Sequence, residues 1–380
     1  MENREIKVDS AEDKRLRQEL EGKHDFDSER LKRWLALPDL TRQPGPIAEM
    51  VKRISAIPRY DDFFRIEAPE IVRADISFDL FDFAADHPAR SASDTYFLDK
   101  DNILRTHTTV MWYYLFQDDR VKKLMAEGQS FGGFSFGKVY RRDEIDRFHS
   151  NVFHQFDGVW FCRKEEKKLG VEDLQQVLIE IAQAVYGPDI EYNFKEDSFP
   201  YTNPSLEMNI MKDGRWVEVL GSGVVNPKVI ANFGADPEIY NGWAYGFGLE
   251  RLAILSMNLP DIRLLRSTDE RVKKQLILGN NYKEVSKYPS SDRDISFYVS
   301  GEFAPNEYFD MIRDMGGELV EEVQLIDKYE NSIGANAGKI SYTFRIIYRA
   351  SDRTLTKNEV EEIQKKIIEQ TASRFQAIIR

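Results

Sequence analysis

The sequence predicts an α+β protein with two domains, each built around its own hydrophobic core. The chain has 380 residues, and 42% of them are hydrophobic, which is enough for two cores. Residues 98–255 hold many short strand-like segments, a pattern typical of a large antiparallel sheet. Beyond this region the order of elements changes. We therefore expect a first domain over residues 45–280 and a second over residues 287–380.

Residues 1–44 are highly charged and poor in branched apolar side chains, so they predict an extension with one or two exposed helices. The first residues are too acidic for a transit peptide and lack the apolar core of a signal peptide, which favours a cytoplasmic protein. Cys162 is the single cysteine, so an intrachain disulfide and a cysteine-based zinc cluster are excluded. No apolar stretch reaches membrane-spanning length, so no membrane partner is expected.

An amphipathic helix and a strand are predicted at the start of the first domain. The helix has apolar residues at helical spacing, and they stop before Pro58. They are Ile47, Met50, Val51, Ile54 and Ile57. Residues 63–72 then read as a strand that contains Pro69, and residues 171–186 interrupt the later strands with a helix.

A long hairpin is predicted from two alternating segments, residues 137–143 and 152–160, joined by a charged loop. Because side chains alternate across a strand, Gln155 and Asp157 point to the same side. An arginine for phosphate, Arg141, together with a glutamine and a carboxylate, fits an α-amino acid bound beside ATP. An exposed hairpin with ordinary surface charges remains the alternative.

Residues 242–251 end one strand and open one helix, with two glycines at the junction. Gly246 and Gly248 lack a Cβ and therefore let a flat ligand approach the backbone closely. Arg251 falls in the first helical turn, where the unpaired N–H groups and the helix dipole already favour phosphate. A plain tight turn is the alternative for this segment alone.

The second domain shows the order β-α-β-β-α-β, which is a ferredoxin-like split unit. The elements are a strand at 294–299, a helix at 305–315, strands at 319–326 and 340–348, a helix opened by a capping box of Thr356 and Glu359, and a strand near 375–379. Many unrelated functions share this fold, so the fold alone does not establish RNA binding.

The charge of the chain is uneven. The formal net charge is -12, which disfavours phosphate contact overall. From Arg345 to Arg380, however, eight basic residues stand against five acidic ones, which indicates a basic patch on an acidic body. Tyr298 and Tyr348 would either stack on unpaired bases there or pack into the core.

Taken together, the motifs resemble those of the class II aminoacyl-tRNA synthetases, and among them the phenylalanyl-tRNA synthetases. GKVYRRDEIDRFHSNVFHQFDG resembles the second motif of the class, and GWAYGFGLERLAIL resembles the third. Further similar segments are ADHPARSASDTYFL, LRTHTT, FPYTNPSLEM and WVEVLGSGVVNPKV. They occur in the order and spacing of the family from about residue 45 onward. The arrangement is most similar to the single-chain form found in mitochondria, with an anticodon-binding domain at the C-terminus.

This resemblance implies a two-step reaction in which ATP and phenylalanine give phenylalanyl-adenylate and the acyl group then passes to tRNA(Phe). Arg141 would hold the α-phosphate, Arg251 the γ-phosphate, and Glu218 would hold ATP with magnesium, so these three carry the catalytic roles. His149 would contact the phosphate tail. The implied ATP site comprises Arg141, Asp143, His149, Glu218, Gly248 and Arg251.

The resemblance also implies a phenylalanine site, in which Gln155 and Asp157 hold the ammonium group and aromatic residues surround the ring. Its residues are His107, Thr109, Trp112, Gln155, Asp157, Phe199, Tyr201, Thr202, Ala244, Tyr245 and Gly246. The family generally has Glu at positions 143 and 157 and Gln at position 112, so this chain departs from the pattern there.

Several further expectations follow from the resemblance. The protein would act as a monomer on tRNA(Phe), with ATP and magnesium. Because the chain offers no room for an editing domain, measurable charging with tyrosine is expected. Two alternatives remain open: a class II synthetase-like protein for another aromatic amino acid, and an RNA-binding paralogue that charges no tRNA.

Overall fold

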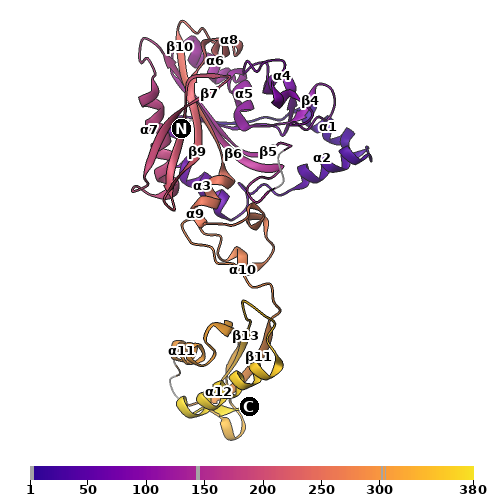
Figure 1. Ribbon diagram of the computed structural model, residues 1–380, viewed down its shortest axis with the longest axis vertical. Helices are drawn as coiled ribbons and strands as arrows, with labels where there is room; N and C mark the ends of the chain where they lie inside the picture. The colour runs from indigo at the N-terminus through magenta and orange to yellow at the C-terminus, as the bar shows by residue number, and fades with distance from the viewer. Residues whose placement is uncertain (1–3, 143–145, 301–302, 304) are drawn as a thin grey trace. The chain divides into compact units, whose positions relative to one another are not determined.

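The computed structural model describes residues 4–142, 146–300, 303 and 305–380. The chain divides into two compact units between Tyr282 and Lys283. Both units are drawn in Figure 1. Each combines a mainly antiparallel sheet with helices, which confirms the α+β class.

The first unit is built on an eight-stranded sheet in the order β1-β2-β5-β6-β10-β9-β8-β7. The strands are β1 (Glu5–Lys7), β2 (Phe64–Glu67), β5 (Phe131–Tyr140), β6 (Val152–Arg163), β7 (Tyr192–Phe199), β8 (Thr202–Lys212), β9 (Arg215–Val225) and β10 (Tyr240–Gly248). In this order, every pair of neighbouring strands from β5 across to β7 at the far edge is antiparallel. The first of these pairs is the predicted β5–β6 hairpin. β1 and β2 join in parallel at one edge, which requires long crossover connections.

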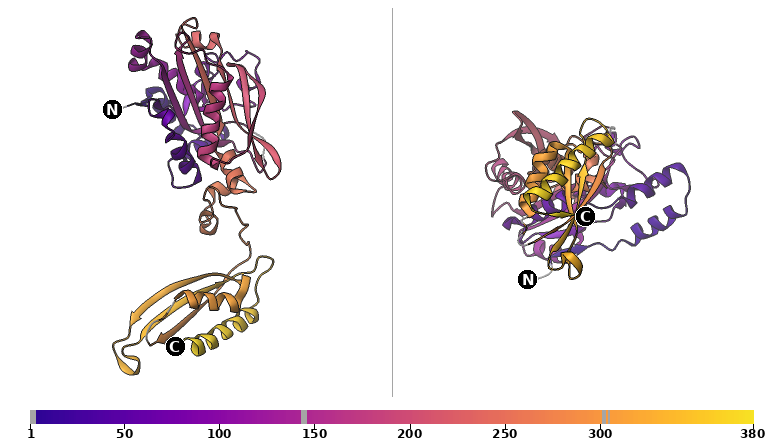
Figure 2. Two further views of the ribbon diagram at one scale, coloured as in Figure 1. Left: turned by 90° about the vertical axis from the view of Figure 1, so that its left-hand side faces the viewer. Right: turned by 90° about the horizontal axis from the view of Figure 1, so that it is seen from below.

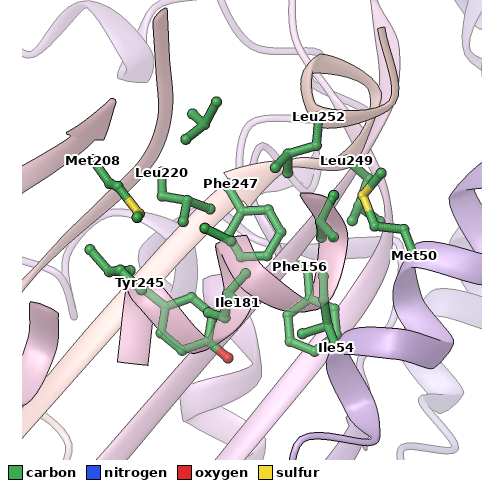
Figure 3. Packing of buried hydrophobic residues seen from close by; sticks show 14 of the residues in the cluster. Met50, Ile54, Phe156, Ile181, Met208, Leu220, Tyr245, Phe247, Leu249 and Leu252 are labelled. Atoms are coloured by element: carbon green, nitrogen blue, oxygen red, sulfur yellow. The ribbon is translucent and has the colours of Figure 1, made fainter. Parts of the chain in front are cut away.

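One face of this sheet is covered by α3 (Pro46–Ser55), α7 (Val171–Tyr186) and α9 (Leu249–Met257). The sequence predicts all three, α9 being the helix that residues 242–251 open. In Figure 3, Ile54 of α3 lies beside Phe156 of the sheet, and Met50 of α3 lies beside Leu249 of α9. Each large apolar side chain buried in this way contributes about 1.5–3 kcal/mol.

The opposite face carries α4 (Ala74–Ser77), α5 (Met111–Gln117), α6 (Asp119–Ala126) and α8 (Pro227–Asn232). The strand expected over 63–72 is in fact broken, and that prediction is wrong. β2 ends at Glu67, and β3 (Ile71–Arg73) pairs instead with β4 (Asn102–Leu104). The break contains Pro69, which has no N–H to donate to a ladder.

The N-terminal segment forms two helices, α1 (Ala11–Glu21) and α2 (Phe26–Ala36), but they are not simply exposed as predicted. Leu16, Leu20 and Leu31 are buried in a cluster with Tyr140 of β5 and Val152 of β6. These three leucines, with Trp34, Leu35 and Leu37 packed against the same cluster, dock the charged segment against the hairpin.

The second unit begins at Lys283 and has a four-stranded sheet in the order β12-β13-β11-β14. Its elements are β11 (Ser291–Val299), α11 (Pro305–Gly316), β12 (Val320–Glu330), β13 (Ile340–Tyr348), α12 (Lys357–Arg374) and β14 (Ile378–Ile379). The short helix α10 (Glu270–Lys273) belongs to the first unit. Both long helices cover the same face of this sheet (Figure 2, left). The predicted order of elements and the capping box of Thr356 and Glu359 are confirmed.

The two tyrosines of this unit differ in their surroundings. Tyr348 is fully buried, and its hydroxyl donates to Gln364 Oε1 at 2.7 Å, so of the two predicted roles the structure shows packing into the core. Tyr298 lies on the face without helices, with the Arg380 guanidinium 5.3 Å from its ring centre. Across the described residues, every helix is too short or too polar to cross a membrane.

Candidate active site

A cavity of about 470 Å³ brings together most residues of the two predicted sites. From the ATP set it is lined by Arg141, His149, Glu218, Gly248 and Arg251, and from the amino-acid set by His107, Thr109, Gln155, Asp157, Phe199, Tyr201, Ala244, Tyr245 and Gly246. Asp143 lies outside the described residues. Trp112 and Thr202 do not line the cavity.

The alternation of β6 decides which of its side chains reach the cavity. Gln155 and Asp157 both face it, as predicted, whereas Phe156 points into the apolar layer on the opposite face (Figure 3). The turn before α5 holds both polar groups. The Thr108 N–H donates to Gln155 Oε1 at 3.3 Å, and the Thr109 hydroxyl donates to Asp157 Oδ2 at 2.8 Å.

Asp157 is 1% exposed, and its second oxygen, Oδ1, has no hydrogen-bond partner among the described residues. Burial raises the pKa of Asp157 to about 6, although hydroxyl donors and the charge of Arg141 oppose this rise. A buried carboxylate with an open oxygen carries a free-energy penalty unless a donor completes it. This side chain is therefore suited to a cationic group entering the cavity.

Gly246, on the neighbouring strand, makes room for this carboxylate. A Cβ at position 246 would overlap Asp157 Oδ1, far inside van der Waals contact. The glycine is therefore needed for the close approach of a side chain, in addition to any contact with a ligand.

His107 presents an acceptor to the same end of the cavity. Burial, with repulsion from Arg141, lowers the pKa of His107 to about 3, so the ring is neutral. Its Nε2 lies 3.2 Å from the Ser77 carbonyl, which can only accept, so the proton resides there. Nδ1 is then a buried acceptor without a hydrogen-bond partner in the part of the chain that the structure describes.

Two arginines also line the cavity. Arg141 Nε donates to the Thr106 carbonyl at 2.8 Å, and its guanidinium lies 5.3 Å from the centre of the Phe153 ring. Arg251 stands in the first turn of α9, as predicted, half exposed and 3.6 Å from Glu218 Oε1. Positive charge at a helix start beside a glycine suits phosphate oxygens.

Glu218 has a carboxylate neighbour that sequence reasoning missed, Glu207 on β8. Burial raises the pKa of Glu207, and repulsion from Glu218 and Asp197 raises it further. Within the described ranges, no cluster of three or more His, Cys, Asp or Glu side chains could hold a metal by itself. Two carboxylates fit a hard divalent cation that takes its remaining ligands from phosphate and water.

Tyr245 reaches the cavity differently from the prediction. Its side chain points to the opposite face of the sheet, where its hydroxyl donates to the Tyr60 hydroxyl at 2.6 Å (Figure 3). The aromatic-pocket role predicted for this side chain is therefore wrong, and the residue lines the cavity through its backbone. Adjacent strand residues face opposite sides, and Ala244 is the one that faces the cavity.

Trp112 and Thr202 also depart from the prediction. Trp112 is fully buried in α5, with its ring centre 5.2 Å from that of Phe81 and 5.7 Å from that of Phe161. The Thr202 hydroxyl is buried and bonded to the Ser205 hydroxyl at 2.8 Å. Both side chains stand behind the cavity wall.

The cavity wall also contains residues that sequence reasoning did not select: Phe83, Phe148, Ser150, Phe153, Val219, Gly221, Ser222, Phe247, Glu250 and Ile262. Several are immediate neighbours of selected residues on β6, β9 and β10. Phe83 and Ile262 come from connecting segments, for which periodicity carries no signal.

Comparisons with known proteins agree with this site. Residues 39–276 match the family model described as tRNA synthetases class II core domain (F), and residues 286–380 match the ferredoxin-fold anticodon binding domain. The mitochondrial phenylalanine–tRNA ligase of Mus musculus is 36% identical, covering 80% of this chain and 72% of the relative. The chloroplastic/mitochondrial enzyme of Arabidopsis thaliana is also 36% identical, covering 82% and 71%. The mitochondrial enzyme of Saccharomyces cerevisiae is 30% identical, covering 80% of each chain.

These relatives correct the expected location. They are mitochondrial or chloroplastic proteins, which contradicts the cytoplasmic assignment drawn from the acidic first residues. The composition of a few terminal residues was too weak a signal against similarity over most of the chain. Both domain models, and relatives similar over most of their length, lead to one family. The chain belongs to the phenylalanine–tRNA ligases of class II, in the single-chain form.

Proposed function

We propose that the protein activates phenylalanine with ATP and transfers the phenylalanyl group to tRNA(Phe). The observation that carries the amino-acid part is the buried, half-satisfied Asp157 in the wall of a cavity that Arg141 and Arg251 also line. A substrate ammonium group would supply the missing partner of Oδ1, and the arginines would accept the phosphates.

The activation step requires positioning and charge neutralisation more than acid–base chemistry. The substrate carboxylate, already charged, attacks the α-phosphorus, and the bond to the β-phosphate oxygen breaks to release pyrophosphate. Arg141 would stabilise charge at the α-phosphate and Arg251 charge at the far phosphate. His149 would contact the phosphate tail from its loop, where Asp146 Oδ2 lies 2.8 Å from Nδ1.

Magnesium would be held by Glu218, with Glu207 beside it, and would neutralise the phosphate charge. The mutual repulsion of these two carboxylates supports this assignment, since a bound cation would offset it. Bound ATP would free Glu218 from Arg251, because the arginine then meets phosphate instead.

The tRNA would be recognised by residues 287–380, with residues 45–280 carrying the chemistry. In the C-terminal unit, Tyr298 and Tyr329 lie on the strands together with Arg380, which donates to the Tyr329 hydroxyl at 2.9 Å. An exposed aromatic group beside an arginine is suited to an unpaired base. We also propose a monomer, because β1 of the same chain already pairs with the edge of β2.

The test of this function is amino-acid-dependent ATP–pyrophosphate exchange with each standard amino acid, followed by charging of tRNA(Phe). Exchange strongest with phenylalanine, and transfer to tRNA(Phe), would establish both steps. No exchange with any amino acid would overturn the proposal. If exchange were strongest with another aromatic amino acid, the proposed substrate would be wrong, but the proposed reaction would stand.

Replacing Gly246 by alanine is expected to raise the KM for phenylalanine about 10- to 100-fold, because the new methyl group displaces Asp157. The measurement is pyrophosphate exchange at saturating ATP. The control is Gly248→Ala on the same strand, where an added Cβ meets only Phe153, at 3.9 Å. Equal phenylalanine KM values for the two variants would contradict this account of Gly246.

Ala244→Gly is expected to admit larger para-substituted rings, because Ala244 faces the cavity and is packed in the apolar cluster behind it. One methyl-sized space is worth about 10- to 200-fold in discrimination. In the variant, the ratio of the exchange rate with para-chlorophenylalanine to that with phenylalanine should rise about 10- to 200-fold. An unchanged ratio would place the para position elsewhere.

A further inference from the structure

His154 is fully buried on β6, next to Gln155 but on the opposite face of the sheet. None of its ring atoms reaches the cavity. A buried imidazole must find partners for both nitrogens, and the identity of those partners determines what it holds together.

One side of the ring is bound by Glu250. The His154 backbone N–H donates to Glu250 Oε2 at 2.8 Å, and ring Nδ1 lies 2.6 Å from Oε1. Glu250 is itself buried, in the first turn of α9, and immediately precedes Arg251. A single carboxylate therefore joins β6, with Gln155 and Asp157, to the helical turn that carries Arg251.

The other side of the ring contacts the segment that precedes α3. The Leu40 N–H donates to Nε2 at 3.0 Å, and Asp39 Oδ1 lies 3.3 Å from the same nitrogen. Asp39 is in turn held by the N–H and hydroxyl of Thr41. The ring is thus held between residues 39–41 and α9.

The link persists in both charge states of the ring. In the neutral ring Nε2 accepts from Leu40, and Nδ1–H donates to Glu250. In the protonated ring Asp39 replaces Leu40 as the partner of Nε2. Burial lowers the pKa of His154, but attraction to Glu250 and Asp39 outweighs burial and raises it.

We propose that His154 is a positioning residue for the activation step, because through Glu250 it sets the place of Arg251 relative to Gln155 and Asp157. The residue touches neither substrate and acts by aligning the phosphate end of the site with the amino-acid end. The N-terminal segment, to which sequence reasoning assigned no chemistry, supports the ring through Leu40 and Asp39. This inference rests on the proposed function.

Two near-isosteric variants separate the two sides of the ring. An asparagine amide can replace Nδ1, so His154→Asn retains a side-chain donor for Glu250 Oε1 and loses the contact with Leu40. A glutamine amide reaches the position of Nε2, so His154→Gln retains that contact and loses the side-chain donor for Glu250 Oε1. The backbone N–H of residue 154 still donates to Glu250 Oε2 in both variants. Ile181→Val, in the apolar layer on the same face of the sheet, is the control for lost stability alone.

The measurement is pyrophosphate exchange with separate KM values for ATP and phenylalanine, together with the melting temperature of each variant. We expect His154→Gln to raise the KM for ATP about 10- to 100-fold and His154→Asn to raise it much less. The KM for phenylalanine should stay near wild type in both variants. Ile181→Val should lower the melting temperature and leave both KM values unchanged.

An unchanged ATP KM in His154→Gln, with only a lower melting temperature, would overturn the positioning role and leave a purely structural histidine. Equal increases in the KM values for ATP and phenylalanine would also overturn the positioning role, because a misplaced Arg251 should weaken the binding of ATP alone. Wild-type protein without exchange would instead overturn the proposed function, so the two failures are distinguishable.

Discussion

Arg251→Ala is expected to lower kcat for pyrophosphate exchange by about 100- to 1,000-fold, the typical effect of removing one preorganised donor from developing charge. Arg251 stands at a helix start, half exposed, and its guanidinium lies 3.6 Å from Glu218 Oε1, so it is well placed to turn toward phosphate. The assay is steady-state exchange with saturating phenylalanine and varied ATP.

The matched control for this prediction is Arg263→Ala. Arg263 is also an exposed arginine of the first unit, paired with Asp261 and absent from the cavity wall. Its loss should leave kcat unchanged, because a surface ion pair contributes little. If Arg251→Ala retained more than about a tenth of wild-type kcat, the charge-stabilising role assigned to Arg251 would be refuted.

Asp157→Asn is expected to raise the KM for phenylalanine at least about 100-fold, since removing one partner of a buried charge pair leaves the other charge uncompensated. The side chain keeps its size and its contact with Thr109, so the cavity itself should persist. Pyrophosphate exchange at varied phenylalanine concentration measures the KM, and the melting temperature reports whether the fold around the cavity persists. A normal KM would show that the ammonium group binds elsewhere.

The same carboxylate predicts a pH dependence. Its pKa is raised to about 6, so protonation neutralises it as the pH falls through that value. The kcat/KM for phenylalanine, which reports on the free enzyme, should then fall with a one-proton slope below about pH 6. Asp157→Asn should lack this slope. The same slope in the variant would assign the titration to another group.

For the aromatic pocket, the alternation of side chains along a strand is a better guide than the resemblance to the family. Ala244 and Tyr245 are neighbours on one strand, so only one of their side chains can face a given side of the sheet. Period 2 was sufficient to make that choice, and it did so correctly for Gln155 and Asp157. For Trp112, no local pattern could tell a side chain in the wall from one behind it.

What the sequence determined by itself is local. The glycine junction before Arg251, the hairpin of β5 and β6, the capping box of α12 and the order of elements in the second unit all depend on neighbouring residues. These features can be predicted from the spacing of apolar residues and from the conformational preferences of single residues, and both can be read from the sequence.

What only the tertiary structure decided is long-range. The parallel addition of β1 to β2, the docking of α1 and α2, and the contacts of His154 with Glu250 and Leu40 join residues from about 60 to about 136 positions apart. Such partners are chosen by the shape and charge of surfaces that exist only after the sheet and helices have packed. A periodic pattern in one segment specifies which face is buried, but it does not specify which distant segment will cover that face.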